Sequence, residues 1–560
     1  MSGDTRLDVW TSKHVVSLQL SPEDLSRPLS NSLRQRDLPL NTRCGGRGLC
    51  DGCVVELLAG RLIHAPSGRT VAAENGPMPV RGCEHWPAPH DQIVLRIPDR
   101  SLLAHEPQIV TEFRVNVSRA HAPLWRRDRF EGQPPPTPLG AAIDIGTTTV
   151  VVMLVDLCDG SILASASALN AQTHFGDNVL TRIQLCLSDP AMLARLQRAI
   201  AEQTIAPLIR QTLNEVGAAP EQLVCLTIAG NTTMLHLLAG ADPSPMGTVP
   251  FTPAFLEHRL LRPDHIGLGA ADAGAGLVVN ARADVHLLPG AAAYVGADLM
   301  AGVGASGMVY RDETCMLVDI GTNGEIILHH NGELLGCATA AGPAFEGSGL
   351  SCGVRAGHGA VAHLRLDGNK SPLQVEVIGH TQPIGLCGTA YIDFLAEGRR
   401  AGLLSATGRL QAGEDNASLT TGDHGRRGFI IAHAQTGKAL AITESDIAAL
   451  LQAKAAIAAG IDCLLGQAGL RTSDVQTLYL AGGFGLHLNV ANAIGCGLLP
   501  GFLAEQVELV GNTALAGAYL ALMDTGALDA ISRISRAIRI VELNLDPRFE
   551  EVFIDRLALP

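Results

Sequence analysis

The sequence lacks a block of basic residues, an apolar stretch near its start, and any uncharged apolar run long enough to cross a membrane. Its 560 residues carry a net charge of −14. An acidic chain without basic blocks is poorly suited to bind nucleic acid or an anionic membrane surface. Signal peptides need an apolar core, and a membrane span needs about 18 or more apolar residues. We therefore expect a cytoplasmic globular protein that binds neither nucleic acid nor membranes.

The sequence also lacks a disulfide framework. Thirteen cysteines are present, of which nine are scattered singly, and none follows Cys496. In a reducing compartment, single cysteines of this kind are usually small buried hydrophobic residues. The other four are grouped near the start of the chain, at Cys44, Cys50, Cys53 and Cys83.

This cysteine quartet has the spacing of a metal centre. Five, two and then twenty-nine residues separate its members, and glycines fill the loop from Cys44 to Cys53. Glycines let such a loop fold tightly, with its thiolates and amides turned inward. The spacing differs by one residue from that of plant-type [2Fe-2S] ferredoxins and resembles that of adrenodoxin-like ferredoxins. A four-cysteine zinc site is the alternative, although zinc sites usually use two Cys-x2-Cys pairs and this segment has one.

The first hundred residues read as a small domain of strands around one helix. Period-two alternation over 14–20 and apolar runs at 54–58 and 93–97 predict strands, and residues 29–35 predict a short helix. Strands around a helix, with the cysteine loop after it, suit a β-grasp ferredoxin fold. We therefore assign residues 1–100 to a [2Fe-2S] ferredoxin-like domain.

Residues 101–138 read as a linker rich in proline and arginine. The segment 132–138 contains four prolines, which cannot continue a helix or a central strand and favour extended polyproline geometry. We expect a semi-rigid connection. Its scattered arginines are expected to form a solvated face; they are Arg119, Arg126, Arg127 and Arg129.

A short motif occurs twice in the remainder of the chain. Ile143–Thr147 (Ile-Asp-Ile-Gly-Thr) recurs at Val318–Thr322 as Val-Asp-Ile-Gly-Thr, 175 residues later. This separation is the size of one α/β domain. It predicts two duplicated halves, residues 139–310 and 311–560, with a cleft between them.

Each copy of the motif suits phosphate binding. An aspartate ends an apolar strand and is followed by glycine and hydroxyl residues. The glycine lets the backbone approach a phosphate, amides and hydroxyls donate to it, and the carboxylate can hold Mg2+. One such motif alone is weak support, because glycine hairpins are common. Five further glycine-rich segments strengthen the interpretation, at residues 229–234, 341–350, 385–389, 481–485 and 511–518.

Together these segments resemble a known superfamily. The two hairpins and Ala481–Gly485 resemble the phosphate-1, phosphate-2 and adenosine motifs of the actin-like ATPases, which include sugar kinases, actin and heat-shock chaperones. With the cysteine quartet, the chain resembles the reductive activators of corrinoid proteins, most specifically at Asp319–Glu325 and Ala341–Gly347. The resemblance implies a β-grasp ferredoxin-like domain followed by a duplicated actin-like (ribonuclease H-like) ATPase fold.

The family resemblance also implies a reaction. An activator of this kind uses ATP and an electron from its [2Fe-2S] cluster to return a corrinoid from Co(II) to Co(I), the state that accepts a methyl group. A plant-type cluster lies near −400 mV, and Co(I) formation lies lower, so the electron runs uphill. The implied partners are a corrinoid protein or corrinoid-dependent methyltransferase and an upstream electron donor, and the resemblance allows a homodimer.

Site residues follow from the same resemblance. Asp144 and Asp319 would organise Mg2+ and the attacking water, with Glu325 and Glu346 as further candidates for positioning that water. Cys44, Cys50, Cys53 and Cys83 would ligate iron. The residues expected to contact ATP are Gly146, Thr147, Thr148, Asn231, Thr232, Gly321, Thr322, Asn323, Gly342, Gly482, Gly483 and Gly485.

Other function classes fit the same motifs. One is a small-molecule kinase regulated by redox state, and another is a nucleotide-switched electron-transfer module that serves a non-corrinoid enzyme. Activators of hydroxyacyl-CoA dehydratases are disfavoured, because they bind a cluster through ATPase-domain cysteines and lack a ferredoxin domain. Larger corrinoid activators carry a middle domain after the cluster domain. Because only residues 101–138 fill that position, we expect this chain to lack it.

Overall fold

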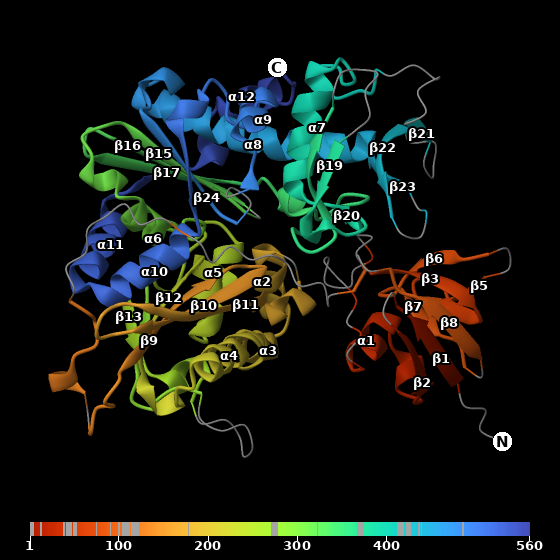
Figure 1. Cartoon of the computed structure of the whole chain (residues 1–560), viewed down its shortest axis with the longest axis horizontal. Helices are drawn as coiled ribbons and strands as arrows, with labels where there is room; N and C mark the ends of the chain where they lie inside the picture. Colours follow the sequence, from red (N-terminus) through yellow and green to blue (C-terminus); the bar gives the residue numbers. More distant parts are fainter. Residues whose placement is uncertain are drawn as a thin grey trace.

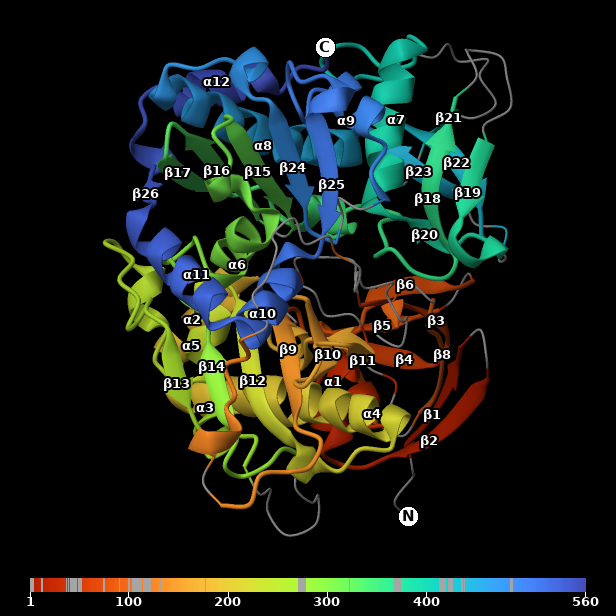
Figure 2. The ribbon, with the colours of Figure 1, turned by 60° about the vertical axis from the view of Figure 1, so that its left-hand side comes forward.

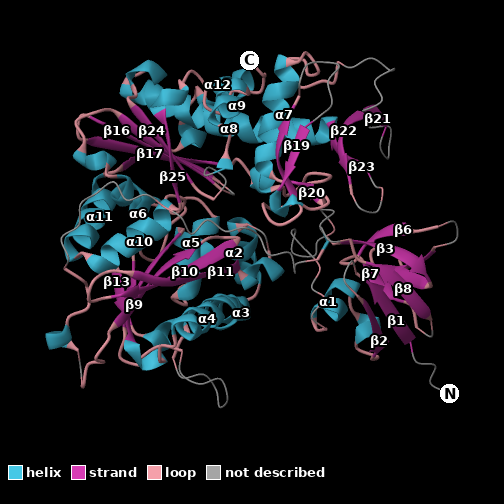
Figure 3. Ribbon diagram, in the orientation of Figure 1, coloured by secondary structure: helices cyan, strands magenta, loops and turns pink. Residues whose placement is uncertain are grey.

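The fold was analysed in a computed structural model of the chain (Figure 1). The structure describes all residues except 1–4, 12–13, 37, 39, 41–47, 49–52, 74–75, 90, 99–100, 103–112, 114–121, 131, 177, 270–277, 322, 367–373, 412–418, 422–426, 435–436, 438 and 484–486. The N-terminal unit lies beside two larger α/β halves, and helices flank the large sheet of each half (Figure 3).

The N-terminal unit contains two sheets and one short α-helix. The larger sheet has the order β2-β1-β8-β3-β6, in which β1 and β8 are parallel and the other pairs are antiparallel. Leu29 and Leu33, four residues apart on the helix, are fully buried in one core with Leu7 and Val9 of the sheet. The strands predicted at 14–20, 54–58 and 93–97 and the helix at 29–35 all form, within a residue or two. The elements are β1 (Thr5–Trp10), β2 (Val15–Leu20), η1 (Asp24–Ser26), α1 (Leu29–Arg34), β3 (Val54–Ala59), β4 (Arg61–His64), β5 (Arg69–Ala72), β6 (Met78–Arg81), β7 (His85–Pro87) and β8 (Gln92–Arg96).

A buried carboxylate anchors the chain before α1. Asp24 is fully buried and forms ion pairs with Arg27 at 2.7 Å and Arg36 at 2.5 Å. It also accepts a 2.8 Å hydrogen bond from the backbone amide of Ser21. Burial alone would raise the pKa of Asp24, but the hydrogen bonds from Arg36, Ser21 and Arg27 hold it well below its usual range.

The linker is docked on the second half of the chain. Ala122 forms a β-bridge with Asp524, and the Trp125 side chain is buried. Of its arginines, Arg126, Arg127 and Arg129 are exposed, as predicted for a solvated face, whereas Arg119 lies outside the described residues. The short helix η3 spans Arg127–Arg129.

The first half is built on a six-stranded sheet of order β11-β10-β9-β12-β14-β13. β9, β10 and β11 are antiparallel neighbours, whereas β12 is parallel to β9 and to β14. The helical stretch from α3 to α4 is interrupted by a π-helical turn at Ala201–Ile205, because Pro207 has no N–H to give to the α-helical ladder. The elements are β9 (Leu139–Ile145), β10 (Thr149–Asp156), β11 (Ile162–Leu169), α2 (Val179–Ser188), α3 (Ala191–Ile200), α4 (Ala206–Val216), β12 (Leu223–Gly230), α5 (Thr232–Leu238), β13 (Arg259–Leu261), β14 (Asp284–Leu287) and α6 (Ala297–Ser306).

The second half repeats this plan, with a sheet of order β25-β24-β15-β16-β17-β26. Two three-stranded sheets and α7 form an added lobe beside it (Figure 2). The elements of the large sheet and its helices are β15 (Cys315–Ile320), β16 (Gly324–His330), β17 (Glu333–Thr339), α8 (Glu444–Ala468), β24 (Thr477–Ala481), α9 (Val490–Gly495), β25 (Val507–Gly511), α10 (Thr513–Met523), α11 (Thr525–Ala537), β26 (Arg539–Ile540) and α12 (Phe549–Arg556). Those of the added lobe are β18 (Ala360–Arg365), β19 (Gln374–Val377), β20 (Gly385–Leu386), α7 (Gly388–Arg400), β21 (Leu419–Thr421), β22 (Arg427–His433) and β23 (Ala439–Thr443).

Five strands of the two large sheets share one topology, whereas the sixth is added at different edges, β13 beside β14 and β26 beside β17. In each, the third, second and first strands form antiparallel neighbours, and two later strands continue the sheet on the other side of the first. β9 and β15 are the equivalent first strands, and they carry Asp144 and Asp319 one residue before their ends. The duplication predicted from the repeated motif is thus present in the fold.

Helices α6 and α10 pack closely between the halves (Figure 1). A Cβ on Gly517 of α10 would lie 2.3 Å from the carbonyl oxygen of Ala301 on α6, so only glycine allows this approach. α10 follows β25 of the second half yet packs on β9 and β12 of the first. The chain therefore crosses back from one half to the other at this point.

Helix α8 is long and apolar enough to cross a membrane by length and composition alone. However, 78% of its most apolar window is buried inside the protein. It begins with a capping box, in which the side chains of Thr443 and Asp446 each accept a hydrogen bond from the other residue's backbone amide. Its buried Lys454 donates to the carbonyls of Arg556, at 2.5 Å, and Ala558, at 2.7 Å. The apolar character of α8 therefore matches a core helix of this fold.

Candidate functional site

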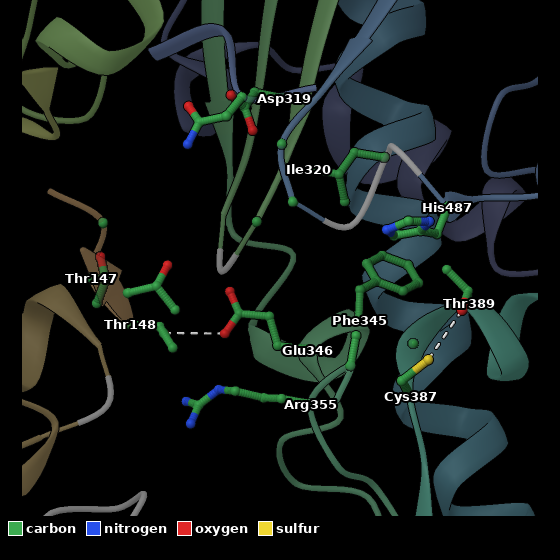
Figure 4. A pocket seen from close by; sticks show the side chains of 18 of the residues that line it. Thr147, Thr148, Asp319, Ile320, Phe345, Glu346, Arg355, Cys387, Thr389 and His487 are labelled. Carbon is green, nitrogen blue, oxygen red and sulfur yellow. Dashed lines mark hydrogen bonds between the residues drawn. The ribbon is translucent and has the colours of Figure 1, made fainter. Parts of the chain in front are cut away.

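A cavity of about 510 Å3 lies where the ends of β9 and β15 meet, and residues of both halves line it (Figure 4). Its size is that of a small-molecule binding site. Most residues predicted to contact nucleotide or to activate water line it, namely Asp144, Gly146, Thr147, Thr148, Asn231, Asp319, Gly321, Asn323, Glu325, Glu346, Gly482 and Gly483.

Two predicted residues do not line the cavity. The Thr232 hydroxyl donates a 2.7 Å hydrogen bond to the carbonyl of Ala292, which ties down the first turn of α5. Gly342 is also absent from the cavity wall and instead takes a positive φ of 74° before a short turn. Thr322 and Gly485 lie outside the described residues.

The first hairpin joins β9 to β10 at Gly146–Thr148. The Gly146 amide donates to the carbonyl of Thr149 at 2.8 Å, and a Cβ on Gly146 would lie 2.8 Å from that oxygen. The tight turn therefore requires glycine. Asn231 donates a 3.0 Å hydrogen bond to the Thr147 hydroxyl, which fixes that side chain in the wall of the cavity.

Arg182 supports this hairpin from behind, and sequence reasoning missed it. Its side chain is fully buried on α2 and donates to the backbone carbonyl of Thr147. It also donates to Gln172 at 2.9 Å and to the carbonyl of Gly176 at 3.0 Å. A guanidinium has five donors in a rigid fork, so one residue can hold several loops at once.

The second hairpin joins β15 to β16. Asp319 is paired across the two strands with Glu325, so both carboxyl groups lie on the same face. Gly482, at the end of β24, packs directly against this strand with a φ of +92°. A Cβ there would lie 2.7 Å from a carboxylate oxygen of Asp319. The glycine pair predicted to lie against adenosine thus also shapes the second hairpin.

Four partly buried carboxyl groups line the cavity from these strands and from α6. Burial raises the pKa of Asp144 and of Asp319 to about 7, with further increases from neighbouring acids. Burial also raises the pKa of Asp298 to about 6 and that of Glu325 well above its usual value. Asp298 was not among the predicted site residues. The sequence pattern that could have identified Asp298 is the Gly-Ala-Asp segment at the start of an apolar helix.

These acids fit a magnesium ion that is shared with a ligand. Oxygen donors suit Mg2+, which is usually held by one or two carboxylates together with substrate phosphates and water. Among the described residues, no three His, Cys, Asp or Glu side chains are grouped closely enough to hold a metal by themselves. The donor set therefore fits Mg2+ bound with phosphate and does not form a closed protein site.

The opposite end of the cavity is formed by the added lobe and by the loop after β24. His363 lines the cavity and contacts the buried Asp393 through a 2.9 Å hydrogen bond. Asp393 also accepts from Asn492 at 2.7 Å. The hydrogen bond to Asp393 raises the pKa of His363, although burial opposes it. Phe345, Thr389 and His487 complete this end of the cavity, as seen on the right of Figure 4.

Two hydrogen bonds cross the cavity between the halves. Thr148 of the first half donates to Glu346 of the second at 3.2 Å, as Figure 4 shows. Asn512, at the start of α10, donates to Asp144 at 2.8 Å. The predicted Asp and Glu residues are therefore brought together with partners that lie far away in the sequence.

In the N-terminal unit, the structure brings together two members of the cysteine quartet. Cys53 precedes β3 and Cys83 follows β6, and the pairing of these strands places their sulfur atoms 3.3 Å apart. Two thiolates on one tetrahedral metal ion, with bonds of about 2.3 Å, lie roughly 3.8 Å apart. Both cysteines are buried. Cys44 and Cys50 lie outside the described residues.

Comparisons with known proteins identify the chain's relatives. A family profile described as "C-terminal domain of RACo the ASKHA domain" matches residues 313–560, and one described as "RACo middle region" matches residues 139–311. The corrinoid activation enzyme RamQ of Eubacterium limosum is 31% identical over 92% of this chain and 93% of its own length. A reductase of Methanosarcina barkeri, named for a Co(II) methylated amine-specific corrinoid protein, is 22% identical over 71% of this chain and 72% of its own.

A solved structure agrees with these matches. It is named a reductive activator for corrinoid, iron-sulfur protein, and it superposes with a TM-score of 0.72 and 28% identity over 99% of this chain and 98% of its own. The match to the middle region covers residues 139–311, which were predicted as the first half of the ATPase and carry the first sheet and hairpin, so the absence of an extra domain at 101–138 stays a prediction. The chain therefore belongs to the family of reductive activators of corrinoid proteins.

Proposed function

We propose that this protein uses ATP to reduce the cobalt of a corrinoid partner from Co(II) to Co(I), with one electron drawn from a [2Fe-2S] cluster in its N-terminal unit. The observation that carries the proposal is the cavity lined by both Asp144 and Asp319, the equivalent residues of two halves that share a five-strand topology. A site of this form suits a nucleotide triphosphate clamped between two hairpins.

The proposed roles in nucleotide binding follow from the cavity wall. Amides and hydroxyls of the hairpins at Thr147, Thr148 and Asn323 would hold the phosphates, and Gly482 and Gly483 would lie against the adenosine. Mg2+, when bound, would neutralise the charge on the phosphate oxygens.

The carboxyl groups of the cavity suit activation of water. A group with a pKa near 7 can accept a proton at neutral pH and release it again, which is the requirement for a general base. Asp144 and Asp319 have such pKa values, of about 7 each. Burial also raises the pKa of Glu325 well above its usual value, and this residue lies beside Asp319 across the strand pair.

The N-terminal unit would supply the electron. An antiparallel hairpin, a parallel β1–β8 pair and one helix packed on the sheet are the features of a β-grasp ferredoxin. We propose that Cys44, Cys50, Cys53 and Cys83 hold the cluster, with the last two already adjacent. When bound, the cluster would supply one low-potential electron. Zinc would fit the same four thiols but has no redox chemistry, so it would leave the reductive reaction without a donor.

ATP is proposed to drive the unfavourable electron transfer through closure of the two halves. A one-electron gap of 100 mV corresponds to about 2.3 kcal/mol, since a tenfold change in the equilibrium constant is about 59 mV. Closure about the tightly packed α6 and α10 would reshape the surface offered to the partner. The proposed partners are a cytoplasmic corrinoid protein or corrinoid-dependent methyltransferase and an upstream reductant.

The deciding experiment is anaerobic. The reduced protein is mixed with a Co(II) corrinoid protein with and without Mg-ATP, and the Co(I) absorption band is followed. We expect Co(I) to accumulate only with ATP, and not with a non-hydrolysable analogue if hydrolysis is required. An absence of ATP-dependent Co(I), with every candidate corrinoid protein encoded nearby in the genome, would overturn the proposal.

A further inference from the structure

The nucleotide cavity is dominated by acids, and among its described lining residues Arg355 is the one arginine or lysine. It belongs to the loop between Glu346 and β18, in the second half. In Figure 4 its side chain extends from this loop, below Glu346, toward the first hairpin at Thr148. A positive group therefore lies on the side of the cavity opposite Asp319.

The backbone beside Arg355 is held firmly. The amide of Val354 donates to the carbonyl of Leu386 in β20 at 2.9 Å, and the Leu386 amide returns a 2.8 Å bond to Cys352. Gly347 and Gly353 pack so closely that a Cβ on Gly353 would lie 2.0 Å from the Gly347 carbonyl oxygen. Because this segment is tied to a strand and folded on itself, it can present its side chain in a defined position.

The guanidinium of Arg355 can bind an anion. Its Nε is buried without a hydrogen-bond partner, and no ion pair to it occurs among the described residues. An arginine is always charged, and its planar fork of donors matches phosphate oxygens. A buried and unused donor of this kind is costly unless a ligand satisfies it.

The position of Arg355 indicates which part of the nucleotide it would contact. His487 lies at the end of the cavity away from the first hairpin, which is the proposed adenosine end, whereas Thr148 belongs to the first hairpin, at the proposed phosphate end. The 3.2 Å bond from Thr148 to Glu346 shows that the two halves already approach each other at this end. An anion here would lie between a hydroxyl of one half and the guanidinium of the other.

We propose that Arg355 binds the γ-phosphate of ATP and stabilises the charge that develops on it during hydrolysis. This inference rests on the proposed ATPase function and assigns the residue that distinguishes ATP from ADP. The phosphoryl group passes from the β-γ bridging oxygen to water, and Arg355 takes no part in the proton transfer. Arginines that stabilise a transferring phosphoryl group act in this way from within a chain or from a partner.

The test uses the full-length protein with its cluster. Binding of Mg-ADP and of a non-hydrolysable Mg-ATP analogue is measured by titration calorimetry for the wild type and for Arg355→Gln, together with kcat and KM for ATP. We expect Arg355→Gln to weaken binding of the analogue about 10- to 100-fold, since charged hydrogen bonds are lost, and to leave ADP binding within about twofold. The kcat for hydrolysis should fall by about 100-fold or more.

Arg365→Gln is the matched control, because Arg365 lies on β18 in the same lobe but is exposed and absent from the cavity wall. It should leave all these values unchanged. If Arg355→Gln does not fold, the same binding and kinetic measurements are made on Arg355→Lys. We expect this variant to recover part of the analogue binding, because lysine keeps the positive charge but lacks the planar fork of donors.

Four outcomes would overturn the inference. Equal weakening of ADP and analogue binding would place Arg355 elsewhere on the nucleotide, and unchanged analogue binding would remove it from the site. A wild-type protein that binds neither nucleotide would overturn the proposed function as well, whereas normal ATP-dependent Co(I) formation by Arg355→Gln would overturn the inference alone.

Discussion

Asn512 connects the two halves of the protein with one side chain. Its amide nitrogen donates a 2.8 Å hydrogen bond to Asp144, while its amide oxygen accepts from the Leu515 backbone and caps α10. The residue that begins the crossing helix therefore also holds a cavity carboxylate of the other half. This hydrogen bond lowers the pKa of Asp144, against the larger increase caused by burial.

Replacement of Asn512 by alanine should therefore have two effects. Loss of the cap should destabilise the protein by about 0.5–2 kcal/mol. Loss of the bond to Asp144 should raise the pKa of that carboxyl further and shift the acidic limb of the ATPase pH profile upward. Asn489→Ala removes the cap of α9, in which Asn489 accepts from the Asn492 amide at 3.2 Å, and provides the control. An equal pH shift in the control would contradict this role.

Asp319→Ala should abolish ATP hydrolysis and leave the visible absorption of the cluster intact. The carboxyl group lies on the equivalent first strand of the second half and faces the cavity, far in sequence from the cysteines. Steady-state phosphate release and the absorption spectrum are measured on the same sample. Normal hydrolysis by this variant would show that the second hairpin does not bind the phosphates.

Cys83→Ser should remove the cluster and leave ATP hydrolysis in place. The sulfur of Cys83 lies 3.3 Å from that of Cys53, so one ligand of an adjacent pair would be lost. Cys186→Ser, which changes a buried single cysteine, is the control. Iron, sulfide and zinc are quantified in each protein. A colourless wild-type protein with one zinc ion would contradict the cluster assignment.

Stability without nucleotide should decrease between about pH 5 and pH 8. Asp144 and Asp319 are held near pKa 7, against about 3.9 in an unfolded chain. An acid whose pKa is raised on folding binds more protons when folded, so its contribution is present at low pH and is lost as pH rises through 7. Tm is measured across this range, with Asp144→Asn combined with Asp319→Asn as the comparison that isolates these groups from His363.

The same experiment with Mg-ADP should show a larger gain in Tm at pH 8 than at pH 6. At pH 8 the two carboxyl groups have lost their protons, and Mg2+ then compensates their charge. A flat Tm profile in the wild type, or one that the double variant does not flatten, would contradict the burial of these charges.

Gly482→Ala should damage the second hairpin. The new Cβ would lie 2.6 Å from the Ile320 carbonyl and 2.7 Å from Asp319, in addition to the strain of a φ of +92°. Gly469→Ala has a similar φ of +69° but open space around it, and should cost only about 1 kcal/mol. We expect Gly482→Ala to lower Tm more and to reduce ATPase activity. Equal effects of the two variants would show that the close contact with Asp319 is unimportant.

Sequence reasoning located the hairpins because their chemistry is local. Gly146 is required by a turn that closes within three residues, and the capping box of α8 involves residues three positions apart. Such patterns are visible in one short window of sequence. The same is true of the repeated motif, whose copies occupy equivalent first strands of two similar sheets.

The residues that sequence reasoning missed act through distant contacts. Arg182 holds a carbonyl 35 positions away, and Asn512 bonds a carboxylate 368 positions away. Arg182 has no local pattern that marks it, and the glycine-rich segment 511–518 includes Asn512 without indicating its partner. Thr232, in contrast, had a suitable pattern, but packing directed its hydroxyl to Ala292 and away from the cavity.

The sequence by itself determined the two hairpins, the order of the small strands and helix in the N-terminal unit, and the family of the chain, because turns, caps and alternation depend on near neighbours. Only the tertiary structure decided which carboxyl groups gather at one cavity, which donors hold them, and that Cys83 returns to Cys53. These properties depend on loss of solvent and on contacts through space, and strand pairing across the sheets creates both.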